Sequence, residues 1–157
     1  MTESDKTYLV VVQCHLVQQR CSGFHCEKAF TDRTGGFARY ANRPGLRRLS
    51  LTCGGCCGRA LQRKLSHLLR SAHQRDGIEA AQVVVHLASC ICKDNHHGPP
   101  CPHLDYLKTL VSRLGLDLVE DSWISRTAEK RRQQGLYTPN GEPEQTVVVS
   151  SPVRPLP

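Results

Sequence analysis

The chain has 157 residues, which is the length of one domain with a short extension. Its formal net charge is +7, and 39% of its residues are hydrophobic. No apolar run approaches the roughly 20 residues that span a bilayer, which argues against an integral membrane protein. The first residues are polar and partly acidic, unlike a secretory signal, so we expect a cytoplasmic protein without a membrane partner.

Four short apolar segments predict strands, because they are rich in β-branched residues and end at cysteine, glycine or polar residues. These segments are 6–13, 46–52, 81–89 and 116–120. Helical patterns separate them, at 24–33, from Arg59 to Gly77 and from Pro102 to Gly115. The order β-α-β-α-β-α-β implies right-handed crossovers between parallel strands.

The predicted fold is therefore α/β, a small three-layer sandwich with a four-stranded, mainly parallel sheet in the order 2-1-3-4. This architecture is similar to the flavodoxin and Rossmann types. We expect the domain to occupy residues 1–120, with a basic helix possible within 121–137. Residues 138–157 are rich in proline and lack periodicity, which predicts a disordered tail.

The helix after Arg59 is amphipathic, with an apolar stripe and a basic outer face. The stripe holds Leu61, Leu65, Leu68, Leu69 and Ala72. The basic face holds Arg59, Arg63 and Arg70. Few aromatic residues are available to stack on bases, and a charged helix face is usually only solvated, so we do not expect nucleic acid as a partner.

Nine cysteines and eight histidines are the most informative feature of the composition. An odd cysteine count without an export signal favours metal binding or redox chemistry over a disulfide scaffold. Cys14, Cys53 and Cys90 each follow a predicted strand. Because the carboxyl ends of parallel strands share one edge of a sheet, we expect these thiols to lie along that edge, where α/β proteins bind ligands.

The motif Cys53-Gly54-Gly55-Cys56 lies between a strand and a helix. Two sulfurs at this spacing can bind one zinc ion, and the same spacing suits a redox dithiol. An iron–sulfur cluster or copper(I) would accept thiolates as well. The flanking patterns are C-x6-C-x4-C and C-x-C-x8-C-x-H, formed by Cys14, Cys21, Cys26, Cys90, Cys92, Cys101 and His103.

From about Tyr8 to Glu120, these motifs resemble the CGGC-domain family of small α/β proteins. The resemblance implies metal binding, with zinc suggested by the cysteine and histidine content, and no established reaction. Carried over by position, it implies the ligands Cys14, Cys21, Cys26, Cys53, Cys56, Cys90, Cys101 and His103. Cys57 and Cys92 are extras to the family pattern, and His96-His97 is a local feature that it does not explain.

Our leading hypothesis is a zinc protein with Cys14, Cys53, Cys56 and Cys90 as inner ligands. Cys101 or His103 would complete this set or replace one ligand. The alternatives are a thiol–disulfide oxidoreductase that uses Cys53 and Cys56, and an iron–sulfur protein, so catalysis remains an open question. Cys21 and Cys26 could form a second site or a regulatory disulfide, and His86 is expected in the core or at an interface.

Overall fold

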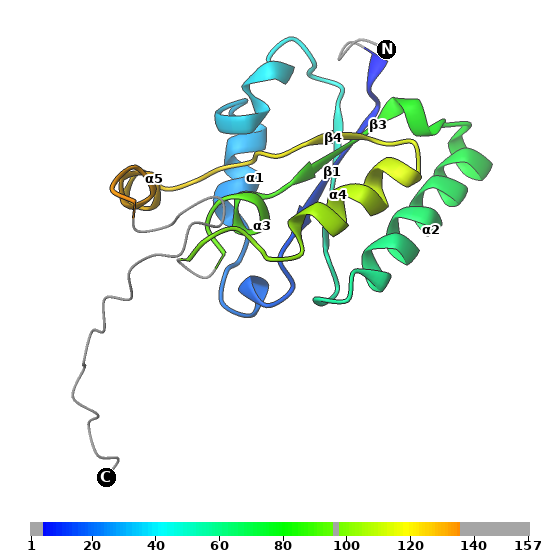
Figure 1. Ribbon diagram of the computed structural model, residues 1–157. Coiled ribbons are helices and arrows are strands. Elements are labelled where there is room, and N and C mark those ends of the chain that lie inside the picture. Colours follow the sequence, from blue (N-terminus) through cyan, green and yellow to red (C-terminus); the bar gives the residue numbers. More distant parts are fainter. Residues whose placement is uncertain (1–4, 96–97, 136–157) are drawn as a thin grey trace.

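The computed structural model describes residues 5–95 and 98–135 (Figure 1). The predicted tail at 138–157 and the pair His96-His97 lie outside this range. Within the described residues, no helix combines the length and the apolar character needed to cross a membrane.

A four-stranded, fully parallel sheet forms the centre of the molecule (Figure 1). Its order is β2-β1-β3-β4, which confirms the predicted α/β fold and strand order. The strands are β1 (Tyr8–Gln13), β2 (Arg47–Thr52), β3 (Val83–Leu87) and β4 (Asp117–Val119). The central strand β1 is buried on both faces, as expected when helices cover a parallel sheet on both sides.

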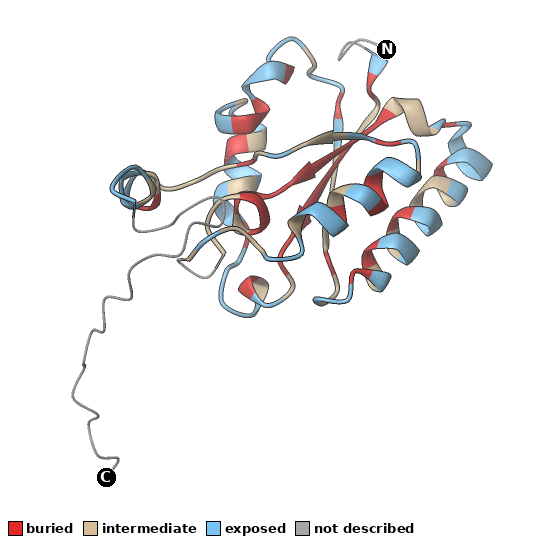
Figure 2. Ribbon diagram, in the orientation of Figure 1, coloured by how far each residue is buried: buried red, intermediate tan, exposed pale blue. Residues whose placement is uncertain are grey.

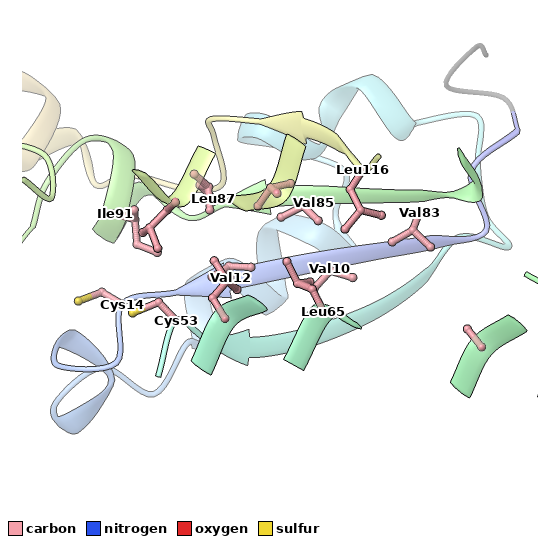
Figure 3. Close-up of a cluster of buried hydrophobic side chains, with 14 of the residues drawn as sticks. Val10, Val12, Cys14, Cys53, Leu65, Val83, Val85, Leu87, Ile91 and Leu116 are labelled. Atoms are coloured by element: carbon pink, nitrogen blue, oxygen red, sulfur yellow. The ribbon is translucent and has the colours of Figure 1, made fainter. Parts of the chain in front are cut away.

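Side chains alternate along β1, so each face of the sheet has its own core. Val10 and Val12 belong to the larger core, beneath α2 (Arg59–Asp76) and α4 (Leu104–Arg113) (Figure 3). Leu9 and Val11 face the other core, together with Ala29 of α1 (Phe24–Thr31). Figure 2 shows the buried stripes of α2 and α4, while their outer faces are exposed. These layers form the predicted three-layer sandwich.

Several short elements were not predicted, because they depend on contacts between distant segments. The helix α3 (Ser89–Cys92) follows β3, and 3-10 turns occupy Val17–Gln19, Gly35–Tyr40 and Ala80–Gln82. The helix α5 (Arg126–Gln133) lies within the segment 121–137 and begins at Ser125, whose hydroxyl accepts the Ala128 N–H at 3.1 Å.

His86 lies in the core, as predicted, and joins three segments there. It is fully buried in β3, with Nε2 2.8 Å from the Tyr40 hydroxyl and Nδ1 2.8 Å from the Asp121 carbonyl oxygen. The carbonyl oxygen can only accept, so Nδ1 donates to it and Nε2 accepts from Tyr40. Burial lowers the pKa of His86 from 6.5 to about 4, so the ring is neutral at physiological pH.

Candidate functional site

The carboxyl edge of the sheet places Cys14 and Cys53 next to each other. Gln13 and Thr52 are partners at the end of the β1–β2 ladder, and the Cys53 N–H donates to the Gln13 carbonyl oxygen at 2.9 Å. Both cysteines are buried, and Figure 3 shows their side chains together beyond the end of β1. The strand register therefore brings together two thiols that are 39 positions apart in the sequence.

Two successive backbone N–H groups at the end of β1 donate to cysteine sulfurs from different segments. The Cys14 N–H lies 3.2 Å from Cys90 Sγ, and the His15 N–H lies 3.4 Å from Cys53 Sγ. Burial nevertheless raises the pKa of Cys90 to about 12, against the opposing effect of the Cys14 N–H. The turn after β1 thus fixes one sulfur from the residue after β2 and one from the segment after β3.

The loop Cys53-Gly54-Gly55-Cys56 can adopt its path only with glycine at position 54. Gly54 has a φ of 75°, and a Cβ there would lie 2.3 Å from the Ala60 Cβ. Lys64 of α2 links this helix to the residue before the loop. Its ammonium donates to the Thr52 carbonyl oxygen at 2.9 Å and to the Thr52 hydroxyl at 3.0 Å. This path leaves Cys53 buried and Cys56 exposed.

A cavity of about 180 Å³ opens between this loop and the start of α4. We call it the CGGC cavity, and the cysteines and histidines of its lining are Cys14, His15, Cys53, Cys56, Cys101 and His103. The Cys101 N–H donates to the Ile91 carbonyl oxygen at 2.8 Å, which holds the loop before α4 against the short helix α3. The pKa of Cys101 is raised, first by burial and in part by the neighbouring thiols.

The chemistry of this lining fits a soft or borderline metal ion, because thiolates and imidazoles are the ligands that zinc prefers. The geometry is less complete. Among the described residues, no three cysteine, histidine or acidic side chains are arranged so that they could hold one ion together. The CGGC cavity therefore gathers a suitable set of ligands without presenting a finished coordination site.

A second cavity, of about 480 Å³, lies at the same edge on the opposite face of the sheet. We call it the α1 cavity, and its characteristic lining residues are Gln13, Cys21, Cys26, Cys90 and Trp123. The alternation along β1 explains the separation, because successive side chains point to opposite faces. Gln13 therefore lines the α1 cavity, whereas the next residue, Cys14, lines the CGGC cavity.

The structure thus divides the predicted ligands between two places. The CGGC cavity holds Cys14, Cys53, Cys56, Cys101 and His103, and the α1 cavity holds Cys21, Cys26 and Cys90. Neither lining includes Cys57, which is exposed, or Cys92, which is buried and donates its S–H to the Leu87 carbonyl oxygen at 3.3 Å. Burial raises the pKa of Cys92 to about 12, which fits a structural thiol.

The sequence analysis did not identify His15, which lines the CGGC cavity, or Gln13, His25 and Trp123, which line the α1 cavity. His25 and Trp123 stack with their ring centroids 4.1 Å apart and their planes at 10°, and both line the α1 cavity. For Gln13 a signal existed, since it immediately precedes a strand-end cysteine and must face the other way. For the stacked pair none existed, because they are 98 positions apart in the sequence.

Comparison with known proteins identifies the family. No curated protein and no solved structure matches the chain. The model of the CGGC domain matches residues 8–123, which include the whole sheet and both cavities except the segment at the start of α5. The chain therefore belongs to the CGGC-domain family.

Proposed function

We propose that the protein binds one zinc ion in the CGGC cavity, through thiolates of Cys14, Cys53, Cys56 and Cys101. The observation that carries this proposal is the gathering of four thiols and the His103 imidazole around a single cavity of about 180 Å³. Membership of a family whose cysteine and histidine content suggests metal binding supports it.

The proposal revises the ligand set that the sequence analysis favoured. Cys90 lines the α1 cavity, and its sulfur accepts the Cys14 N–H, whereas Cys101 lines the CGGC cavity itself. His103 is exposed and stands at the N-terminus of α4, where it can replace one thiolate. With four protein ligands the zinc would be structural, and with three it would keep a position open for water or substrate.

Binding of zinc also agrees with the state of the thiols. All nine cysteines are free in the structure, and free thiols persist in a reducing compartment such as the cytosol. Burial, and to a lesser extent the neighbouring thiols, raise the pKa of Cys101, so this thiol does not ionise readily without a cation. A divalent cation reverses this balance, because it stabilises all neighbouring thiolates at once.

The test is elemental analysis of protein purified without oxygen. We expect about one zinc per chain, and near-complete loss of zinc in the double variant Cys53→Ser, Cys56→Ser. The matched control is Cys57→Ser, since Cys57 adjoins Cys56 and is equally exposed but lies outside the cavity. Zinc that remains in the double variant would refute the ligand assignment. Iron with sulfide, and visible absorption, would instead support the iron–sulfur alternative.

One observation favours a second candidate function, thiol–disulfide exchange at the CGGC loop. Cys56 is exposed and Cys53 is buried beside it, as expected of an attacking and a resolving thiol. Cys56 thiolate would attack a substrate disulfide and release one substrate thiol. Cys53 would then displace the second substrate thiol, which leaves a Cys53–Cys56 disulfide and a reduced substrate.

This alternative is separable from zinc binding by a single-turnover assay. If it is correct, metal-free protein reduces one equivalent of disulfide and acquires the Cys53–Cys56 bond. Cys56→Ser would abolish this reaction, while Cys57→Ser would leave it unchanged. If the metal-free protein reduces no disulfide with this pair, the redox function is excluded.

A further inference from the structure

The α1 cavity is unexplained by zinc binding in the CGGC cavity. Its volume of about 480 Å³ lies in the range of small-molecule sites and far exceeds the space of a single ion. It contains three cysteines, yet no three metal-binding side chains converge anywhere in the described residues. The large volume of the cavity is therefore the feature that indicates an organic ligand.

Gln13 supplies an unused polar group in this cavity. Its side chain is only 6% exposed, and its amide nitrogen lies within 2.9 Å of where a Cβ on Gly23 would be. Within residues 5–95 and 98–135, the Gln13 side chain makes no hydrogen bond to the protein. The amide is not among the fully enclosed unpaired groups of the described residues, so its donor and acceptor atoms can be reached by a ligand in the cavity.

The N-terminus of α1 supplies a second set of donors. Gly23 precedes the helix and offers no side-chain cap, and the N–H of Phe24 is taken by the Ser22 hydroxyl at 3.3 Å. The next two N–H groups, of His25 and Cys26, have no acceptor among the described residues. Orphan N–H groups and the helix dipole favour an anion at this position.

The charged and aromatic side chains of the lining further restrict the class of ligand that fits the α1 cavity. Arg20 and Asp94 both line the cavity, so it offers one cationic and one anionic side chain. The stacked rings of His25 and Trp123 form a flat wall beside them. This combination suits a small organic molecule that carries a carboxylate together with an uncharged or amino-acid portion.

The three thiols of the α1 cavity are not equivalent. Cys26 donates its S–H to the Ser122 hydroxyl at 3.6 Å, and Cys90 is held by the Cys14 N–H. Cys21 is the exposed member, and no other residue in the described part of the chain forms a hydrogen bond with its sulfur. Cys21 is therefore the thiol that an incoming ligand can reach.

We propose that the α1 cavity binds a small carboxylate-bearing disulfide, which Cys21 attacks. The Cys21 thiolate forms a bond to one sulfur of the ligand, the ligand's S–S bond breaks, and the second half leaves as a thiolate. The carboxylate of the retained half accepts hydrogen bonds from the N–H groups at the start of α1. The amide or amino group of the same half forms a hydrogen bond with the Gln13 side chain. No further oxidant is required, because the ligand disulfide is reduced as the mixed disulfide forms.

The experiment compares two disulfides on the reduced full-length protein, with the site of modification identified by peptide mass spectrometry. Glutathione disulfide carries carboxylates, and hydroxyethyl disulfide is neutral. We expect glutathione disulfide to modify Cys21 faster, after correction for the rates of both reagents with a free thiol. Gln13→Leu should slow its reaction about tenfold, by the loss of one hydrogen bond to the ligand.

Gln19→Leu is the control, because Gln19 lies in the 3-10 turn that follows β1, outside the cavity lining, and its loss should leave both rates unchanged. Gln13→Glu should slow glutathione disulfide selectively, which keeps the test decisive if Gln13→Leu fails to fold. Equal corrected rates for the two disulfides, or modification confined to Cys56 and Cys57, would overturn the proposal. These outcomes are independent of zinc content, since none of the proposed zinc ligands takes part.

Discussion

The two cavities share one turn of the chain but differ in almost everything that determines chemistry. The CGGC cavity is small, rich in thiols, and bounded by a loop that requires glycine. The α1 cavity is larger and combines thiols with an unpaired amide, helix N–H groups and a stacked ring pair. The comparison shows that cysteines at the ends of neighbouring strands can line cavities of different size and composition, because the residues around them differ.

The largest expected difference between the two cavities is in the reactivity of their thiols, Cys56 and Cys90. Cys90, at the α1 cavity, has a pKa of about 12 against an ordinary value of 9.0, so its thiolate population is about a thousandfold smaller than that of an ordinary thiol. Cys56, at the CGGC cavity, is exposed. We expect iodoacetamide to modify Cys56 at least about a thousandfold faster than Cys90 in metal-free protein at mildly alkaline pH.

Peptide mass spectrometry after timed quenching measures both rates in one sample. Cys92 provides an internal control, since burial raises its pKa to about 12 as well, although it lines neither cavity. Similar rates for Cys56 and Cys90 would contradict the burial of Cys90. Denaturant should make all three thiols react alike, which tests whether the fold causes the difference.

Acid should weaken the fold through His86, whose link to Asp121 holds the segment that forms one wall of the α1 cavity. Its pKa is about 4 in the folded protein against 6.5 when exposed. Between these values the unfolded chain binds the extra proton, so the free energy of unfolding falls as pH falls. Integrated over this window, the loss from this group is about 3 kcal/mol.

Denaturant titrations at a series of pH values measure this loss. His86→Gln should be less stable at neutral pH. It should also lack the fall in the free energy of unfolding that His86 causes between pH 6.5 and 4. His67→Gln, on the exposed face of α2, should retain the full pH dependence of the unmodified protein. An identical pH profile for His86→Gln and the unmodified protein would show that the buried ring does not titrate as described.

A smaller loss of stability than that from His86 is expected from a substitution in the CGGC loop, where Gly54 has a φ of 75°. Gly54→Ala should lower the free energy of unfolding by about 1–2 kcal/mol from backbone strain alone, with an additional loss from the contact with Ala60. Gly45→Ala is the control, because Gly45 has open space around its Cα and no positive φ. Thermal unfolding compares the two, and equal melting temperatures would show that the loop relaxes freely.

The same variant tests whether the cavities are independent. Gly54→Ala should disturb zinc binding at the CGGC cavity, while the rate of Cys21 modification by glutathione disulfide should stay within about twofold, since Gly54 is not part of the α1 cavity. A large change in both zinc binding and the rate of Cys21 modification would show that the turn after β1 couples the two cavities.

The fold was predictable because its signals are local. Four β-branched apolar segments, separated by the amphipathic pattern around Leu61 and Leu65, predict parallel strands with crossover helices, and the structure has them in the predicted order. The gathering of cysteines at one edge follows from the same reasoning, since Cys14 and Cys53 directly follow their strands. The short helix α3 escaped prediction, because its four residues carry no periodicity.

The sequence by itself determined the sheet order, the edge at which the thiols gather and the CGGC-domain family, because periodicity and motif spacing are properties of neighbouring residues. Only the tertiary structure decided which thiols share a cavity. Cys14 and Cys101, 87 positions apart, line the same cavity, whereas Cys90 lines the α1 cavity although its sulfur accepts the Cys14 N–H. Such contacts depend on how far each loop travels after its strand ends, and spacing along the chain does not record that distance.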